Sequence, residues 1–217
     1  MAVELRNILK ELTAEAFANT ITHGFGLALS IVGFIILVIL AVIRGDAWLI
    51  TGSGVYGMSL VTLYAASTCY HATNCPIRKK RPQIVDHCCI YLLIAGSYTP
   101  FGIVILNGTF GLSLLVLIWA FAAVGILLKL FFHDRFPIIS TMSYLVMGWL
   151  GIFALQPLFE ALGIMPIILA VIGGATYSLG VIFFAWERIP HNHAIFHVFV
   201  LAGSIFHYLA VAIYVVS

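Results

Sequence analysis

Two histidines, His193 and His197, stand one helical turn apart at the start of the last apolar run of the chain. Residues four apart share one face of an α-helix, so both imidazoles point the same way. A histidine pair with this spacing offers two ligands to a metal ion. The run over 193–216 is long enough to cross a bilayer, and histidine at membrane depth usually has a function. The pair is a candidate for two ligands of a metal site at or just inside a membrane.

Further polar residues stand at the ends of three other apolar runs. The second run ends in His71, with Ser67 one turn before it, and the third opens with Asp86. Each lies a few residues from a basic residue that marks the same side of the membrane. We therefore expect one polar layer near the inner leaflet, joined from the first run by a stripe of candidate site-lining residues: Glu15, Asn19 and His23.

Three neutral imidazoles with one open position are typical of a catalytic zinc site, and His71, His193 and His197 can supply them. Zinc lowers the pKa of a bound water to about 7, so that a carboxylate can remove its proton. Asp86 is the candidate base, and its predicted place near a helix N-terminus favours its ionised form. Ser67 is the candidate that positions water or substrate. A hydrogen-bonded polar cluster without metal explains the same residues, and spacing alone leaves both readings open.

The composition indicates an integral membrane protein. Of the 217 residues, 63% are hydrophobic and 8% are charged, whereas soluble domains carry roughly 25% charge. Seven apolar segments are each long enough for a transmembrane helix and too long for the strands of a β-barrel. We therefore predict an all-α, polytopic membrane protein with seven transmembrane helices, over 20–43, 48–70, 86–106, 110–132, 138–156, 163–186 and 193–216.

The first 17 residues have the spacing of an amphipathic helix and lack the apolar segment of a signal peptide. Leu5, Ile8, Leu9 and Leu12 fall on one helical face. We predict an interfacial helix over 1–17 that lies on the membrane surface, followed by a seven-helix transmembrane domain over 18–217.

Basic residues predict the orientation of the seven spans. Nine of the ten fall on one side: Arg6, Lys10, Arg78, Lys79, Lys80, Arg81, Lys129, Arg135 and Arg188. Because basic residues stay on the cytoplasmic side, we expect a cytoplasmic N-terminus and a C-terminus outside. The net charge of +2 is too small to suggest nucleic acid as a partner.

Two more residues have structural interpretations. Pro100 should kink the third span. His207 lies ten residues beyond His197, about 15 Å along the helix, so it cannot join the same site. An interhelical hydrogen bond is its expected role.

Several motifs, taken in order, resemble those of a known family. They are the stretch from Glu15 to Gly24 with Asn19 and His23, Ser67-Thr68-Cys69-Tyr70-His71, Asp86-His87-Cys88, the stretch from Tyr91 to Pro100, and His193-Ala194-Ile195-Phe196-His197. Over nearly the whole chain they resemble the bacterial hemolysin III branch of the progestin and adipoQ receptor superfamily. The resemblance implies zinc held by His71, His193 and His197 near the cytoplasmic leaflet, with Ser67 and Asp86 beside the metal.

The wider superfamily includes alkaline ceramidases and adiponectin receptors, which implies hydrolysis of a lipid amide. We expect a zinc-dependent hydrolase that acts on a lipid amide or ester, in the inner membrane of a bacterial cell. One alternative is a sensor or receptor for membrane homeostasis, with structural zinc closed by a fourth side chain. Another is a hemolysin-type pore-forming cytolysin, which requires a continuous polar path across the bundle.

Overall fold

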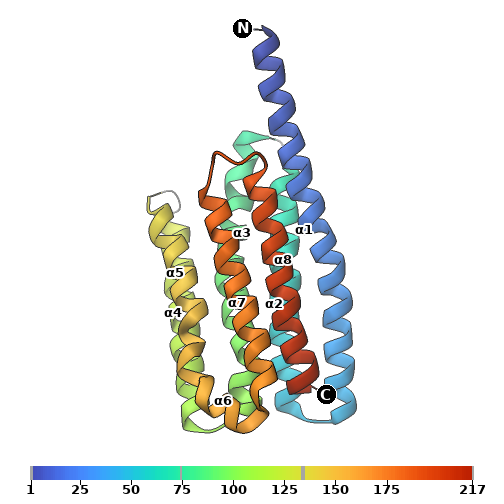
Figure 1. Cartoon of the computed structure of the whole chain (residues 1–217), viewed down its shortest axis with the longest axis vertical. Coiled ribbons are helices and arrows are strands. Elements are labelled where there is room, and N and C mark those ends of the chain that lie inside the picture. The colour runs from blue at the N-terminus through green and yellow to red at the C-terminus, as the bar shows by residue number, and fades with distance from the viewer. Residues whose placement is uncertain (1, 74, 133–134, 217) are drawn as a thin grey trace.

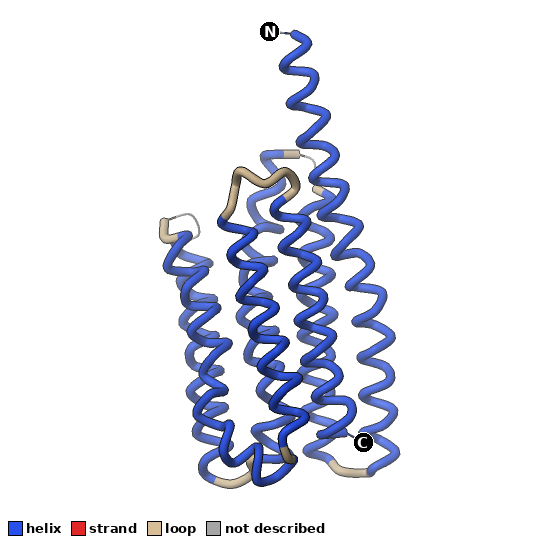
Figure 2. Tube along the Cα trace, in the orientation of Figure 1, coloured by secondary structure: helices blue, strands red, loops and turns tan. Residues whose placement is uncertain are grey.

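The computed structural model describes residues 2–73, 75–132 and 135–216, with the side chains outside 2–13 and 76. Nearly all of the described residues are helical, and no strand occurs among them (Figure 2). The elements are α1 (Ala2–Arg44), α2 (Ala47–Ala72), α3 (Pro76–Pro100), η1 (Phe101–Ile105), α4 (Thr109–Phe132), α5 (Pro137–Trp149), η2 (Leu150–Ala154), α6 (Leu155–Leu162), α7 (Ile164–Ala185), α8 (Asn192–Val211) and η3 (Ala212–Val216).

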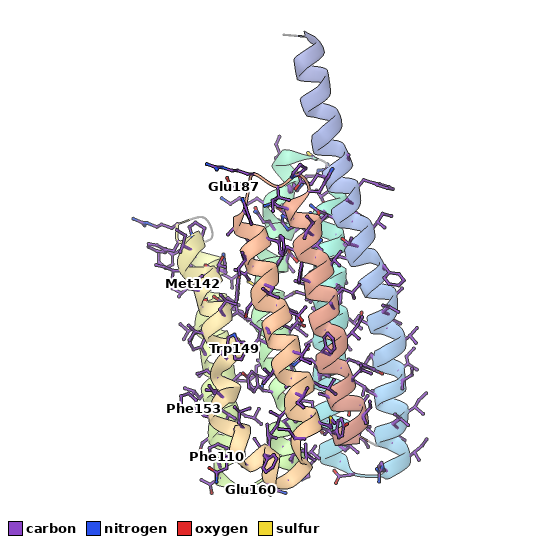
Figure 3. All side chains as sticks on the ribbon, viewed as in Figure 1. Phe110, Met142, Trp149, Phe153, Glu160 and Glu187 are labelled. Carbon is purple, nitrogen blue, oxygen red and sulfur yellow. The ribbon has the colours of Figure 1, made fainter. Side chains whose placement is uncertain are left out.

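Seven helical segments in the described part of the chain are long and apolar enough to cross a membrane, as predicted. They are Ala14–Arg44, Ala47–Ala72, Ile77–Ile105, Thr109–Phe132, Pro137–Leu162, Ile164–Ala185 and Asn192–Val216. Apolar side chains cover the outside of the bundle, such as Met142 and Phe153, while Glu160 and Glu187 lie at opposite ends (Figure 3). The chain is therefore a multi-pass membrane protein, and its orientation in the membrane stays a prediction.

The third span begins earlier than predicted. Pro76 stands at the first turn of α3, where its missing N–H costs nothing, and the basic run after it continues the helix. Asp86 therefore lies ten residues inside α3, about 15 Å from its start. The prediction that Asp86 sits near a helix N-terminus was wrong, and so was the inference that the helix end favours its ionised form.

Two proline- or glycine-containing stretches depart from regular α-helix. The α-helical part of the third span ends at Pro100 and continues as the π-helical turn η1, so the helix is irregular next to this proline, and the kink predicted there stays a prediction. The fifth span is divided by the 3₁₀ turn η2 into α5 and α6. These breaks lie far along the bundle from the histidine end.

Helices α1, α2, α3 and α8 share one apolar core, which includes Leu37, Tyr56, Leu60 and Val211. Helices α3, α4 and α5 share a second core around Tyr91, Ile118 and Met147. α1 and α2 lie side by side, and so do α7 and α8 (Figure 1). The last turns of α2 and the first turns of α8 consequently meet at one end of the bundle.

Residues 2–17 of the predicted interfacial segment are part of α1, which runs without a break from Ala2 and extends beyond the bundle (Figure 1). The side chains of residues 1–13 lie outside the described residues. An interfacial location for this segment, and a domain boundary after residue 17, therefore stay predictions.

Candidate metal centre

His71, His193 and His197 come together where α2 ends and α8 begins. One nitrogen from each ring lies within 4.8 Å of those of the other two. The ring centroids are 4.9 Å apart for His71 and His193, 4.8 Å for His71 and His197, and 4.7 Å for His193 and His197. The three rings form a nearly equilateral triangle. This group could hold a metal ion, as the spacing of the histidines predicted.

Local structure fixes both helix ends that carry these histidines. His71 lies in the last turn of α2, which ends where the backbone N–H of Thr73 donates to the carbonyl of Tyr70. Before α8, His191 adopts the left-handed conformation with φ 56°, which turns the chain into the helix. The Asn192 side chain then donates to the Phe184 carbonyl at 2.9 Å and joins α8 to α7. This hydrogen bond anchors the start of α8, the helix that carries His193 and His197, to α7.

A threonine of α1 determines which nitrogen of His197 is available. The Thr22 hydroxyl donates to the carbonyls of Ala18, at 2.9 Å, and Asn19, at 3.0 Å. Its oxygen also lies 3.3 Å from His197 Nδ1. Because the hydroxyl hydrogen is directed to the backbone, we assign the tautomer in which the Nδ1–H of His197 donates to Thr22 and Nε2 is the ligand atom. No role was predicted for Thr22 from the sequence, since a threonine that bonds its own helix is common.

Of the predicted site-lining residues on α1, which are Glu15, Asn19 and His23, only some lie beside the three histidines in the described part of the chain. The His23 ring stacks on that of His197, with centroids 3.5 Å apart, and meets the edge of Tyr64 at 5.1 Å. His23 and Asn19 are both 4% exposed and face the bundle interior. Glu15, one turn earlier, is half-buried, and no contact with the three histidines is described for it.

Asp86 and Ser67 are buried, at 8% and 1% exposed, and line the same cavity as His193 and His197. Within the described residues, the group able to hold a metal consists of three histidines and does not include Asp86. The roles predicted for Asp86 and Ser67 stay predictions.

The three histidines fit zinc by ligand type and position. Zinc binds imidazole nitrogen at about 2.0–2.1 Å, and one nitrogen of each ring lies within 4.8 Å of those of the other two. His71 Nε2 is buried without a hydrogen-bond partner among the described residues, which is costly for a polar atom unless it binds a ligand. The geometry does not distinguish zinc from other metals that prefer imidazole.

A cavity of about 550 Å³ extends from the histidines through the bundle. Its histidine end has polar walls, whereas the rest is mostly apolar, with residues such as Ala170 of α7 and Leu158 and Leu162 of α6. Trp149 of α5, visible in Figure 3, also lines it. The volume falls in the range of roughly 300–1,000 Å³ for small-molecule sites. This arrangement can take an amphiphile whose polar end meets the histidines.

The structure adds detail to the predictions for two further residues, Lys129 and His207. Lys129 was predicted only as a marker of the cytoplasmic side, yet it is 5% exposed and lines the cavity. His207 is outside the metal-holding group, as predicted, and lies against Tyr177 with ring centroids 5.5 Å apart. Its predicted hydrogen bond stays a prediction.

The fold and site define a seven-helix membrane protein with a buried three-histidine group. The profile of the family described as Haemolysin-III related matches residues 12–208. The chain therefore belongs to the haemolysin-III related family.

Named relatives support the same assignment. The chain is 46% identical over 203 residues to the hemolysin-3 homolog of Bacillus subtilis (strain 168), covering 94% of this chain and 95% of that protein. It is 46% identical over 207 residues to hemolysin-3 of Bacillus cereus, covering 95% and 94%. It is 31% identical over 205 residues to the human monocyte to macrophage differentiation factor, covering 91% and 83%.

Proposed function

We propose that the protein is a zinc-dependent hydrolase that cleaves an amide or ester bond of a membrane lipid. One observation carries the proposal: the three-histidine group borders a large, mostly apolar cavity that Asp86 and Ser67 also line. A lipid chain in the apolar part would bring its polar end to these residues. Acyl hydrolysis at such a site needs a bound metal, a base and a hydroxyl group that orients the reactants.

In this proposal each residue has one task. His71, His193 and His197 hold zinc, which when bound supplies a Lewis acid and makes a water nucleophilic near neutral pH. Asp86 accepts a proton from the attacking water and returns it to the leaving amine or alcohol. Ser67 hydrogen-bonds the water or the lipid carbonyl. Thr22 and His23 orient the His197 ring, as outer groups do around bound metals.

We place the enzyme in the membrane of a bacterial cell, with its N-terminus in the cytoplasm and the histidines near the inner leaflet. The basic residues support this orientation, because nine of ten fall on the histidine side of a seven-span chain. The Bacillus relatives support a bacterial source.

A membrane-homeostasis sensor with structural zinc is the second candidate. It is favoured by the way that the site joins helices: His71 belongs to α2, His193 and His197 to α8, and His23 of α1 stacks on His197. A structural site has four protein ligands, however, and the described group has three. A pore-forming cytolysin has less support, since the cavity walls beyond the histidine end are mostly apolar.

The test combines metal content with lipid turnover. Purified wild type and variants are reconstituted in vesicles of a bacterial polar lipid extract, supplemented with a ceramide, and free fatty acid is measured by mass spectrometry. We expect His197→Ala to lose zinc and turnover, and Asp86→Asn to keep zinc while fatty-acid release falls about 100-fold or more. His191→Asn is the matched control, because His191 is exposed and asparagine tolerates its left-handed backbone.

The outcomes separate the candidates. Fatty-acid release that is unchanged in Asp86→Asn and His197→Ala would refute the hydrolase. Zinc in the wild type without release from any amide or ester lipid, together with a folded Asp86→Asn protein that loses zinc, would establish the closed structural site.

A further inference from the structure

The charged group of Lys129 has an unusual place for a membrane helix. The buried residues of α4 form one stripe at helical spacing: Gly111, Leu114, Leu115, Ile118, Ala122, Gly125 and Lys129. Lys129 ends this stripe, so it faces the bundle rather than the surface. A lysine near a helix end in a membrane usually extends to the interface. Here the fold turns it inward instead.

The packing of α4 against α3 sets the depth of Lys129. Gly125 lies against the ring of Tyr91, where a Cβ atom would collide with it. The helices run antiparallel, so Lys129, one turn beyond Gly125, lies level with His87 and Cys88, one turn before Tyr91. Lys129 and Asp86 therefore lie at about the same level along the bundle axis.

The cavity joins Lys129 to the candidate metal centre. Lys129, Asp86, Ser67, His193 and His197 all line its walls. Lys129 comes from α4, while the histidines come from α2 and α8. The Lys129 ammonium and the candidate metal ligands therefore lie on different walls of the histidine end of the cavity. The remaining wall is mostly apolar and belongs largely to α5, α6 and α7. The polar end thus offers two separate contact points to the head of one amphiphile.

We infer that Lys129 binds an anionic group, a phosphate or a carboxylate, on the polar head of the lipid held in this cavity. An ammonium in a water-poor site binds an anion with charge-assisted hydrogen bonds, which are about twice as strong as neutral ones. The substrate class of the hydrolase is then an acyl lipid with a negative charge near the cleaved bond. This last step rests on the proposed function, whereas the binding of an anionic amphiphile does not.

The experiment measures binding without turnover. Metal-free protein, prepared with a chelator, is titrated with hexadecyl sulfonate and with hexadecanol, and complexes are counted by native mass spectrometry. The two probes share one chain and differ in charge, and a sulfonate is a weak metal ligand. We expect the wild type to prefer the sulfonate roughly tenfold or more, which corresponds to about 1.4 kcal/mol. Lys129→Met should abolish the preference, and Lys129→Arg should retain it.

Lys80→Met is the matched control, because Lys80 is exposed and is not among the residues lining the cavity. It should leave the preference unchanged. Excess inorganic phosphate distinguishes the source of the anion: a lipid head resists it, whereas displacement of the sulfonate shows a site for free phosphate and overturns the lipid assignment. A folded Lys129→Met protein that keeps the sulfonate preference also overturns the proposal.

Failure here is distinguishable from failure of the hydrolase. His197→Ala should lose zinc and turnover but keep the preference for the sulfonate. A Lys129→Met protein that weakens both probes equally would show a packing role alone and refute the anion site. Turnover in the wild type would still stand in that case.

Discussion

The packed side of the molecule, formed by α1, α2 and α8, differs from its open side, formed by α5 and α7. On the packed side, 50% of the α2 span, 33% of the α8 span and 22% of the α1 span are buried, whereas 11% is buried in the span over Pro137–Leu162 and in that of α7. The open side supplies a large share of the cavity wall, whereas α1 contributes His23 alone. All three candidate metal ligands lie on the packed side. Dense packing holds ligands in place, and loose packing leaves room for a lipid.

Removal of the metal should have the largest effect, and it acts on the packed side. A metal held by residues of α2 and α8 binds the folded state and not the unfolded state, so it raises the free energy of unfolding by an amount set by its binding free energy. We expect a chelator to lower the Tm of the purified wild type by several degrees in a thermal melt. The same treatment should leave the Tm of His71→Ala unchanged. A chelator effect of equal size in both proteins would place the metal elsewhere.

Filling the cavity tests the open side. Ala170→Leu adds three carbons to a wall of α7 that faces the cavity. One surplus methylene in an apolar pocket alters binding by about 10- to 200-fold, so we expect a loss of hexadecyl sulfonate binding in that range. Ala185→Leu, at an exposed position of the same helix, is the control. The Tm should change little, because the added atoms enter empty space. A large fall in Tm with intact binding would mean that α7 is packed as tightly as α2.

Two glycines of α2 test how tightly the packed side is built. A Cβ atom at Gly57 would collide with the Phe34 ring and lies 3.2 Å from the Phe34 Cβ, so α1 must shift. At Gly54 nothing lies within 4 Å of such an atom. We expect Gly57→Ala to cost about 1–3 kcal/mol and to lower the Tm, whereas Gly54→Ala should be neutral or raise it. Equal Tm values would contradict the difference in packing.

Much of this architecture was predictable from sequence, because it rests on local rules. Length and apolarity predict the seven spans, since a helix must be about 20 residues long to cross a bilayer. The i,i+4 spacing of His193 and His197 predicts their shared face, and the depth of His71 predicts the third ligand. The inference depended on helix geometry and on the topology of short connections, both of which are readable from the chain.

Other features of the site depend on how each helix is rotated about its axis relative to its neighbours, and the amino-acid composition does not predict this rotation. Lys129 is a topology marker by sequence, and only the pairing of α4 with α3 turns it inward. Asp86 follows a basic run, which suggests a helix start, but Pro76 starts the helix ten residues earlier. Thr22 resembles any threonine that bonds its own helix until His197 is placed beside it. In each case the local sequence pattern was read from nearby residues, whereas the environment of the side chain depends on residues far away in the sequence.

The contact between Thr22 and His197 gives the smallest predicted effect and the most specific one. Thr22→Val keeps the shape of the side chain and removes the oxygen that accepts the Nδ1–H of His197. Outer hydrogen bonds to metal-bound histidines are typically worth 10–100-fold in affinity, and a neutral hydroxyl belongs at about tenfold. Competition with a chelator of known affinity measures this change. Thr20→Val is the matched control, because the Thr20 hydroxyl donates only to the Ala16 carbonyl, at 2.8 Å, on the same helix. If both variants bind zinc as tightly as the wild type, Thr22 does not set the orientation of His197, and the ring contacts with His23, His71 and His193 hold it instead.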